Sequence, residues 1–160
     1  MESNRLYNWL FYPPVDGLSA NIIIRFLAGS VFLTEGIIKF LFTNQGVGRF
    51  TKIGIPFPDV MAPFVACLEI VGGILLIAGY LTRVISILFI IQMLVAILST
   101  KIAVYLGTSP IIKPQSPPLL GIWAFFHETR IDYAQIMTVI FLLLTGPGKL
   151  SIDAWLRQKK

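Results

Sequence analysis

Long apolar segments, three of them close to the length that crosses a lipid bilayer and a fourth that is shorter, most constrain the fold of this chain. They are expected at about residues 20–42, 60–80, 84–106 and 131–145. A membrane span needs about 20 mostly apolar residues in a helix, which satisfies its own backbone groups. Hydrophobic residues make up 56% of the 160-residue chain, above the roughly 45–50% of soluble domains. The sequence therefore predicts an all-α integral membrane four-helix bundle, forming a single domain over residues 1–160.

The connections between these segments predict how the spans are arranged. The turn at residues 79–83 is so short that the second and third spans are expected to be antiparallel neighbours. A proline-containing loop at 107–130 follows, and its 119–126 part is expected to lie along the interface or to re-enter the membrane. Gly146-Pro147-Gly148 ends the fourth span. The mixed apolar and charged residues 149–160 predict a short amphipathic surface helix.

The distribution of basic residues predicts the orientation. Four spans place both termini on one side, and that side carries most of the Lys and Arg residues outside the spans: Arg5, Arg83, Lys149, Arg157, Lys159 and Lys160, against Arg49, Lys52 and Lys113. Basic residues favour the cytoplasm, so both termini are predicted to be cytoplasmic. The net charge of +5 is attributed to this topology and to lipid contacts. The bilayer is the expected partner, and nucleic-acid binding is not expected.

Ionisable residues within or beside the apolar segments are the candidate ligand-binding residues: Glu35, Lys39, Glu69, Lys101, His127, Arg130 and Asp132. A charge facing lipid is costly, so such side chains usually face the protein interior and mark function. On a helical projection, Glu35 and Lys39 share a face with Gly36, and Glu69 shares one with Gly73. Small residues let helices approach closely in lipid, so these faces are predicted to point inward.

The depth of these residues predicts that they meet. Glu35, Glu69 and Lys101 lie about 10, 14 and 8 Å below the same, outer membrane side at 1.5 Å per residue, and Arg130 and Asp132 lie near that edge. The group is therefore expected to converge in the outer half of the bundle. For Lys101 a snorkelling position is weighted equally, because Gln92 and Ser99 occupy the opposite helix face. Arg25 and Arg83 are expected to snorkel at the inner boundary.

Two interpretations of the buried charges remain open. They form either an ion-pair network that orders the bundle or a polar pocket that binds a small molecule or relays protons. Two carboxylates at similar depth favour the pocket. The lone Cys67 excludes an intrachain disulfide or thiolate metal site and is expected to be an apolar filler. The adjacent His127 and Glu128 are poorly spaced as ligands, so no metal is expected.

Several stretches, in this order, resemble the DoxX family of small four-helix membrane proteins: RFLAG at 25–29, EGIIKF at 35–40, GIPFP at 54–58, LEIVGG at 68–73, GYLTR at 79–83 and GPGKLSID at 146–153. The family takes its name from a subunit of a thiosulfate:quinone oxidoreductase, and other members are linked to quinone or catechol stress, methylamine utilisation and membrane redox complexes. The resemblance implies a bacterial inner (plasma) membrane protein that acts in quinone-linked redox chemistry. Glu35, Lys39, Glu69 and Arg83 match the recurrent polar residues of these motifs, whereas the loop at 107–128 matches none.

The first functional hypothesis is accordingly a quinone-linked oxidoreductase subunit. A quinone headgroup needs hydrogen-bond donors and a route for protons, which Lys39 or His127 with Glu35 and Glu69 could supply. The sequence has no dinucleotide fingerprint, and a single histidine makes haem unlikely as a cofactor. A redox partner protein is therefore expected.

Two other functions remain as alternatives. One is a non-catalytic membrane anchor or assembly subunit that docks a partner through its C-terminal segment. The other is a transporter or proton pathway, which is disfavoured because the chain is short and shows no internal repeat. Assembly into a homo-oligomer would answer the objection of size.

Overall fold

The computed structural model describes residues 2–112 and 114–158. Residues 1, 113, 159 and 160, which include three of the lysines used above to assign the orientation, lie outside the described part. The described residues form helices and loops without any strand, which confirms the all-α prediction. The elements are α1 (Glu2–Phe11), α2 (Asn21–Leu41), α3 (Val47–Lys52), α4 (Pro58–Ala78), α5 (Thr82–Ala96), the π-helix η1 (Ile97–Lys101), α6 (Ile102–Tyr105), α7 (Gly121–Thr145) and α8 (Ile152–Gln158).

Three helices are long and apolar enough to cross a membrane: α2, α4 and the continuous run from α5 through η1 to α6 at Thr82–Tyr105. Each agrees within two residues with an expected span. The apolar segments form these spans because a helix is the local structure that leaves no backbone donor or acceptor facing lipid. The chain is therefore an all-helical membrane protein.

The helix α7 differs from the expected fourth span. It begins at Gly121, ten residues earlier than expected, so residues 121–126 are its first turns and not a separate interfacial or re-entrant piece. Its 25 residues are about 37 Å long. Every 18-residue stretch within it contains Glu128, Arg130 and Asp132, and α7 is not among the helices apolar enough to cross a membrane by composition.

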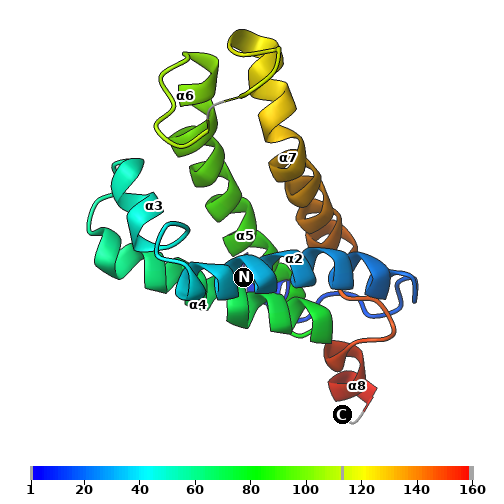
Figure 1. The fold of residues 1–160 in the computed structure, drawn as a ribbon. Helices are drawn as coiled ribbons and strands as arrows, with labels where there is room; N and C mark the ends of the chain where they lie inside the picture. The colour runs from blue at the N-terminus through cyan, green and yellow to red at the C-terminus, as the bar shows by residue number, and fades with distance from the viewer. Residues whose placement is uncertain (1, 113, 159–160) are drawn as a thin grey trace.

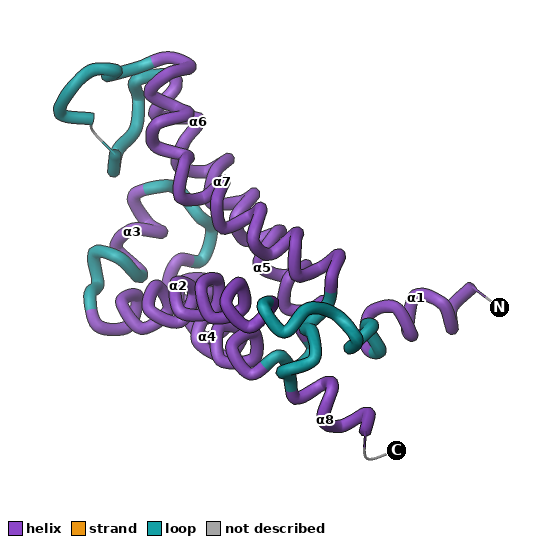
Figure 2. Tube along the Cα trace, turned by 90° about the vertical axis from the view of Figure 1, so that its right-hand side faces the viewer, coloured by secondary structure: helices purple, strands orange, loops and turns teal. Residues whose placement is uncertain are grey.

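The four long helices pack as two pairs, α2 with α4 and α5 with α7. Figures 1 and 2 show that the first pair runs across the second instead of alongside it. Glycines bring α2 and α4 together: a Cβ added at Gly29 would lie 2.7 Å from the carbonyl oxygen of Gly73, and one at Gly36 would lie 2.7 Å from that of Ala66. The predicted small-residue faces are thus the contact between these helices.

The two pairs meet in an apolar core. The rings of Phe32 on α2 and Phe89 on α5 stack with centroids 3.7 Å apart, and Leu76, Val139 and Leu142 complete this cluster. Phe89 also lies against Gly72, where an added Cβ would be 2.6 Å from its Cζ. Dispersion and close packing at these contacts fix how the pairs cross.

Arg25 and Arg83 do not snorkel, contrary to expectation; they are buried, at 1% and 4% exposure. Arg83 donates from Nη1 to the Trp9 carbonyl at 2.7 Å and from Nη2 to the Leu144 carbonyl at 3.1 Å. Its guanidinium also lies 4.4 Å from the centre of the Trp9 ring. Arg25 donates to the carbonyl of Leu150. Both arginines therefore join separate segments of the chain by satisfying backbone carbonyls that lack helical partners.

The C-terminal segment is held against the short turn between α4 and α5. The backbone N–H of Asp153 donates to the Gly79 carbonyl at 3.1 Å, and the Leu81 N–H donates to Asp153 Oδ1 at 3.4 Å. Only glycine fits at position 79, because its φ is +70° and an added Cβ would collide with Arg25. Burial raises the pKa of the Asp153 carboxyl, although these backbone donors and Arg157 and Arg25 act in the opposite direction.

Candidate functional site

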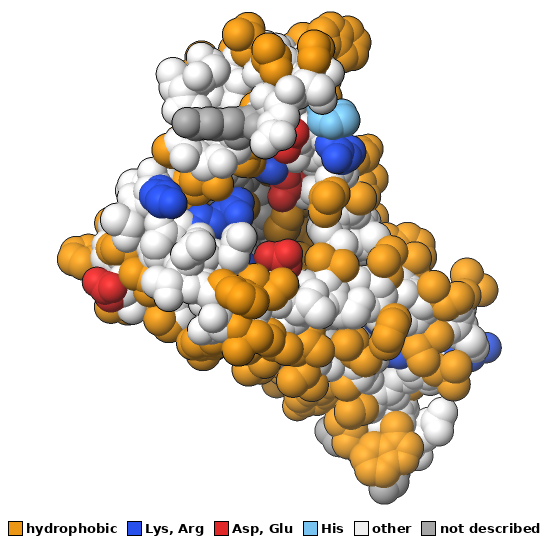
Figure 3. Space-filling view, in the orientation of Figure 1, with side chains coloured by type: hydrophobic (Ala, Val, Ile, Leu, Met, Phe, Trp, Pro, Cys, Tyr) orange, Lys and Arg blue, Asp and Glu red, His pale blue; other side chains and the backbone are white. Residues whose placement is uncertain are grey.

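A cavity of about 400 Å³ opens where the two helix pairs diverge. Its walls come from α2, α4, α5, η1 and α7, and the α3 region closes one side. Figure 3 shows the corresponding hollow, in which blue and red side chains gather. Phe32, Met61, Val65 and Met93 contribute apolar lining. The cavity therefore combines apolar wall with eight charged lining residues, a mixed lining of the kind found in ligand pockets.

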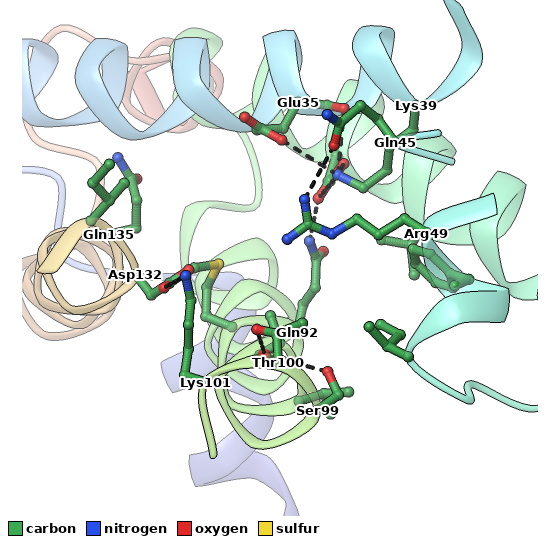
Figure 4. Close-up of a pocket in the computed structure, with 18 of the residues that line it drawn as sticks. Glu35, Lys39, Gln45, Arg49, Gln92, Ser99, Thr100, Lys101, Asp132 and Gln135 are labelled. Carbon is green, nitrogen blue, oxygen red and sulfur yellow. Dashed lines mark hydrogen bonds and ion pairs between the residues drawn. The ribbon is translucent and has the colours of Figure 1, made fainter. Parts of the chain in front are cut away.

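The first charged group in the cavity is centred on Glu69. Lys39 Nζ lies 2.9 Å from Glu69 Oε1 and 2.7 Å from Oε2, and the Gln92 amide N–H donates to Oε1. The side chain of Glu69 is 4% exposed and that of Lys39 is 12% exposed. Lys39 also lies 3.8 Å from Glu35, whose side chain is 58% exposed. Figure 4 shows Glu35 and Lys39 from α2 and Gln92 from α5 at this group.

The second charged group faces the first from the other helix pair. Lys101 Nζ lies 3.3 Å from Asp132 Oδ2, and both side chains are largely buried. Lys101 belongs to η1 and Asp132 to α7, so this ion pair joins α7 to the end of the third span (Figure 4). Lys101 therefore pairs inside the protein instead of extending to the membrane surface.

The π-helix explains why Lys101 and Gln92 line one cavity although an α-helix would place them on opposite faces. A π-turn closes its hydrogen bonds from i to i+5, so it contains about one more residue than an α-turn. Compared with a regular α-helix, η1 therefore changes the direction of the Lys101 side chain relative to that of Gln92 by roughly 100°. Thr100, Ser99 and Lys101 then line the same cavity as Gln92. A π-turn within an α-helix is frequent at functional sites.

The predicted site residues are not all brought together. The cavity lining includes Glu35, Lys39, Glu69, Lys101, Arg130 and Asp132. His127 is exposed and is not part of that lining; its carbonyl accepts a hydrogen bond from Arg130, which is itself exposed at the rim. His127 lies about 140° around α7 from Asp132, so the two side chains leave the helix in different directions.

Sequence reasoning missed seven further polar residues of the cavity wall: Gln45, Arg49, Gln92, Ser99, Thr100, Glu128 and Gln135. Arg49 donates from Nη1 to Gln45 Oε1 at 3.1 Å and extends toward the cavity (Figure 4). Gln92 and Gln135 are amides within apolar segments, and that was the available signal. Arg49 lies in a loop region of the sequence with no periodicity that would have indicated its direction.

Other reactive groups lie apart from this site. Cys67 is exposed on α4, in keeping with its position away from the Glu69 face. Within residues 2–112 and 114–158, no group of three or more His, Cys, Asp or Glu side chains is placed to hold a metal ion. The chemistry offered by the cavity is therefore that of charged and amide hydrogen-bonding groups around an apolar space.

Comparison with known proteins identifies the family. The sequence profile of the DoxX family matches residues 20–102, and the chain belongs to this family. Uncharacterized membrane protein Rv3486 of Mycobacterium tuberculosis is 38% identical over 150 residues, covering 90% of this chain and 85% of its own. No solved structure matches.

Two more distant relatives are similar over most of their length. "Putative oxidoreductase CatD" of Bacillus subtilis is 27% identical over 139 residues, with 87% of this chain and 88% of the relative covered. Inner membrane protein YphA of Escherichia coli is 24% identical over 132 residues, with 82% and 86% covered. The family match, the relatives and the three membrane-capable helices all identify this chain as a membrane protein.

Proposed function

We propose that this protein is a quinone-linked oxidoreductase subunit and that the cavity between the helix pairs binds the ring of a quinone. The observation that carries the proposal is the cavity itself: about 400 Å³, with apolar walls and charged groups contributed by both helix pairs. Ligand pockets of about 300–1,000 Å³ with this mixed lining hold small organic molecules. The name of the Bacillus subtilis relative, which includes the word oxidoreductase, supports redox chemistry in this family.

The proposal assigns roles to the charged groups. Reduction of a quinone to a quinol takes up two electrons and two protons. Glu35, Lys39 and Glu69 form a connected path from an exposed carboxylate to a buried one, which can deliver protons to the cavity. Arg49 and Lys101 present cationic N–H donors toward the space in which the quinone carbonyls would lie. Electrons would come from a redox partner protein.

The proposed setting is a bacterial plasma membrane with α7 as the fourth span and both termini in the cytoplasm. Asp132 supports this role for α7, because it directs its charge into the ion pair with Lys101 instead of toward lipid. The cavity would then open in the outer half of the membrane. Cysteines introduced singly at Asp16 and Thr108, in a Cys67→Ser background, should be labelled by a membrane-impermeant thiol reagent from opposite sides.

Binding of a short-tailed quinone to the purified protein in nanodiscs tests the proposal. We expect saturable binding by the wild type and a bound quinone in the mass spectrum of the preparation. Glu69→Gln should weaken binding at least about tenfold by removing one charge from the hydrogen-bonded path, whereas Asp59→Asn, an exposed carboxylate change on the same helix, should not. Empty preparations together with no saturable binding by the wild type would contradict the proposal.

A second candidate function, a membrane anchor or assembly subunit, is favoured by one observation. The helices α1 and α8 project at the same end of the molecule (Figure 2) and expose large apolar side chains, including Trp9, Phe11, Trp155 and Leu156. Such faces suit a membrane surface or a partner protein. A stoichiometric partner that co-purifies with the wild type but not with Leu156→Asp, with no small ligand present, would favour this function.

A further inference from the structure

Three buried oxygen atoms of the cavity wall accept no hydrogen bond from the described residues: Gln92 Oε1, Gln135 Oε1 and Asp132 Oδ2. Each belongs to a residue that lines the cavity. Asp132 Oδ2 has the charge of Lys101 at 3.3 Å, but this contact is an ion pair and not a hydrogen bond of good geometry. Buried acceptors normally have a donor, and those in a cavity can obtain one from a ligand.

The orientation of the Gln92 amide is fixed by its neighbour. Its nitrogen donates to Glu69 Oε1, and an ionised carboxylate can only accept hydrogen bonds. The amide oxygen must therefore be the atom without a partner. This acceptor is a consequence of the Glu69 network and does not depend on which end of the amide is called nitrogen.

The nearest cation cannot supply the missing donors. The ammonium of Lys39 has three N–H groups, and it has three acceptors: the two oxygens of Glu69 at 2.9 and 2.7 Å and the Glu35 carbonyl at 3.4 Å. All of its donors are thus directed within the protein.

Arg49 and Lys101 also direct donors toward the cavity. However, Arg49 already donates to Gln45, and Lys101 is paired with Asp132. Both side chains are partly exposed, so water can satisfy their remaining N–H groups. Among the described lining residues, the buried polar atoms without a hydrogen-bond partner are therefore all acceptors.

From this imbalance we infer that the cavity binds a dihydroxylated aromatic ring, the reduced quinol, more tightly than the oxidised quinone. A quinol carries two O–H groups that can donate to the side-chain oxygens of Gln92, Gln135 and Asp132, whereas a quinone carries only acceptors. Phe32 and Met93 supply apolar wall for the ring of either form. This inference rests on the proposed function and adds which redox form the site prefers.

The preference has a consequence that can be measured. A site that binds the reduced form more tightly stabilises it, so the midpoint potential of the bound couple rises. For a two-electron couple, a tenfold preference corresponds to about 30 mV. Quinone bound to the protein should therefore be easier to reduce than the same quinone in the membrane.

The test compares the affinities of decylubiquinone and decylubiquinol, measured anaerobically by calorimetry with the wild-type protein in nanodiscs. We expect the quinol to bind about tenfold more tightly. Gln135→Leu removes an acceptor and should abolish much of this preference by weakening quinol binding alone. Gln135→Glu retains an acceptor and should keep the preference. Gln115→Leu, an exposed loop change, is the matched control and should behave as the wild type.

The outcomes separate this inference from the proposed function. Equal affinities in the wild type, or tighter binding of the quinone, would overturn the preference while leaving quinone binding in place. An undiminished preference in both Gln135→Leu and Gln92→Leu would also overturn it, because the unfilled acceptors would then not be its cause. Binding of neither form by the wild type would overturn both the inference and the proposed function.

Discussion

At the scale of single residues, the protein depends on charges that are buried and paired. Glu69 is almost completely enclosed, yet its two oxygens are satisfied by Lys39 and Gln92. Removing one member of a buried pair is costly because the other charge is left without compensation. The sequence showed that these charges lie within apolar segments, and helix geometry predicted inward-facing positions for Glu35, Lys39 and Glu69, which all line the cavity. It could not show that Gln92 would complete the network, since that contact depends on how α5 crosses α4.

The Lys39–Glu69 pair provides the first prediction. Lys39→Met leaves the Glu69 carboxylate buried and unpaired, so the free energy of unfolding should fall by about 3–5 kcal/mol. The double variant Lys39→Met with Glu69→Gln should recover most of that loss, because no unpaired charge remains. Chemical denaturation in detergent micelles measures both. Lys52→Met, at an exposed position, is the control, and a Lys39 variant as stable as this control would contradict the prediction.

Asp153 gives a prediction about pH. Burial raises its pKa in the folded protein above the usual 3.8, so folding favours the protonated carboxyl. As pH rises past 3.8, the unfolded chain ionises first, and the folded state loses stability until the pH exceeds the raised value. Asp153→Asn cannot ionise and keeps an oxygen for the Leu81 N–H. The melting temperature of this variant minus that of the wild type should therefore increase as pH rises from 3 toward neutrality.

The control for this pH dependence is Asp16→Asn, which changes an exposed carboxylate and should follow the wild type at every pH. A difference between Asp153→Asn and the wild type that stays constant, or that shrinks with rising pH, would show that the Asp153 carboxyl is not held in its neutral form by burial.

At the scale of helices, the apolar segments predicted α2, α4 and the third span closely, because a helix is nearly obligatory for such a segment in lipid. Two features escaped prediction. The start of α7 was placed too late because its first turns, rich in aromatic residues, follow a proline-containing loop. The π-helix at Ile97–Lys101 was missed because no local pattern of Ile, Leu, Ser and Thr distinguishes a π-turn from an α-turn.

The contact between α2 and α4 gives a prediction at this scale. Gly36→Ala would place a methyl group 2.7 Å from the Ala66 carbonyl oxygen and 2.9 Å from Glu69 Cβ. The helices would have to separate, which should lower the free energy of unfolding by about 1–3 kcal/mol and loosen the Lys39–Glu69 pair. Thermal unfolding measures this loss. Gly17→Ala, where the nearest atom would be 3.5 Å away, should cost much less, and equal losses would contradict the role assigned to this contact.

At the scale of the whole molecule, two crossed helix pairs diverge around a charged cavity, and buried arginines hold their closed end together. Arg83 donates hydrogen bonds to the carbonyls of Trp9 and Leu144, and Arg25 donates one to the carbonyl of Leu150. The family motif at 146–153 is thereby explained as a structural connection that holds the C-terminal segment against the turn between α4 and α5. The sequence indicated that this motif mattered, but not that it contacts residues 79–83, because that contact exists only in the folded molecule.

This arrangement predicts the effect of Arg83→Met. Loss of the hydrogen bond to the Trp9 carbonyl and of the guanidinium contact with the Trp9 ring should release α1 from α5. Limited proteolysis should cleave the N-terminal residues faster in this variant than in Arg5→Met, an exposed change on α1 itself. Equal cleavage rates would show that Arg83 does not hold the N-terminal segment in place.

The most direct measurement of the central claim is photoaffinity labelling with a quinone whose ring carries a photoreactive group. If one cavity between the two helix pairs holds the ring, labelled peptides will include α4 near Glu69 and α7 near Gln135, and unlabelled quinone will compete for both. Labelling confined to one helix pair, or to lipid-facing residues without competition, would contradict a shared ligand site.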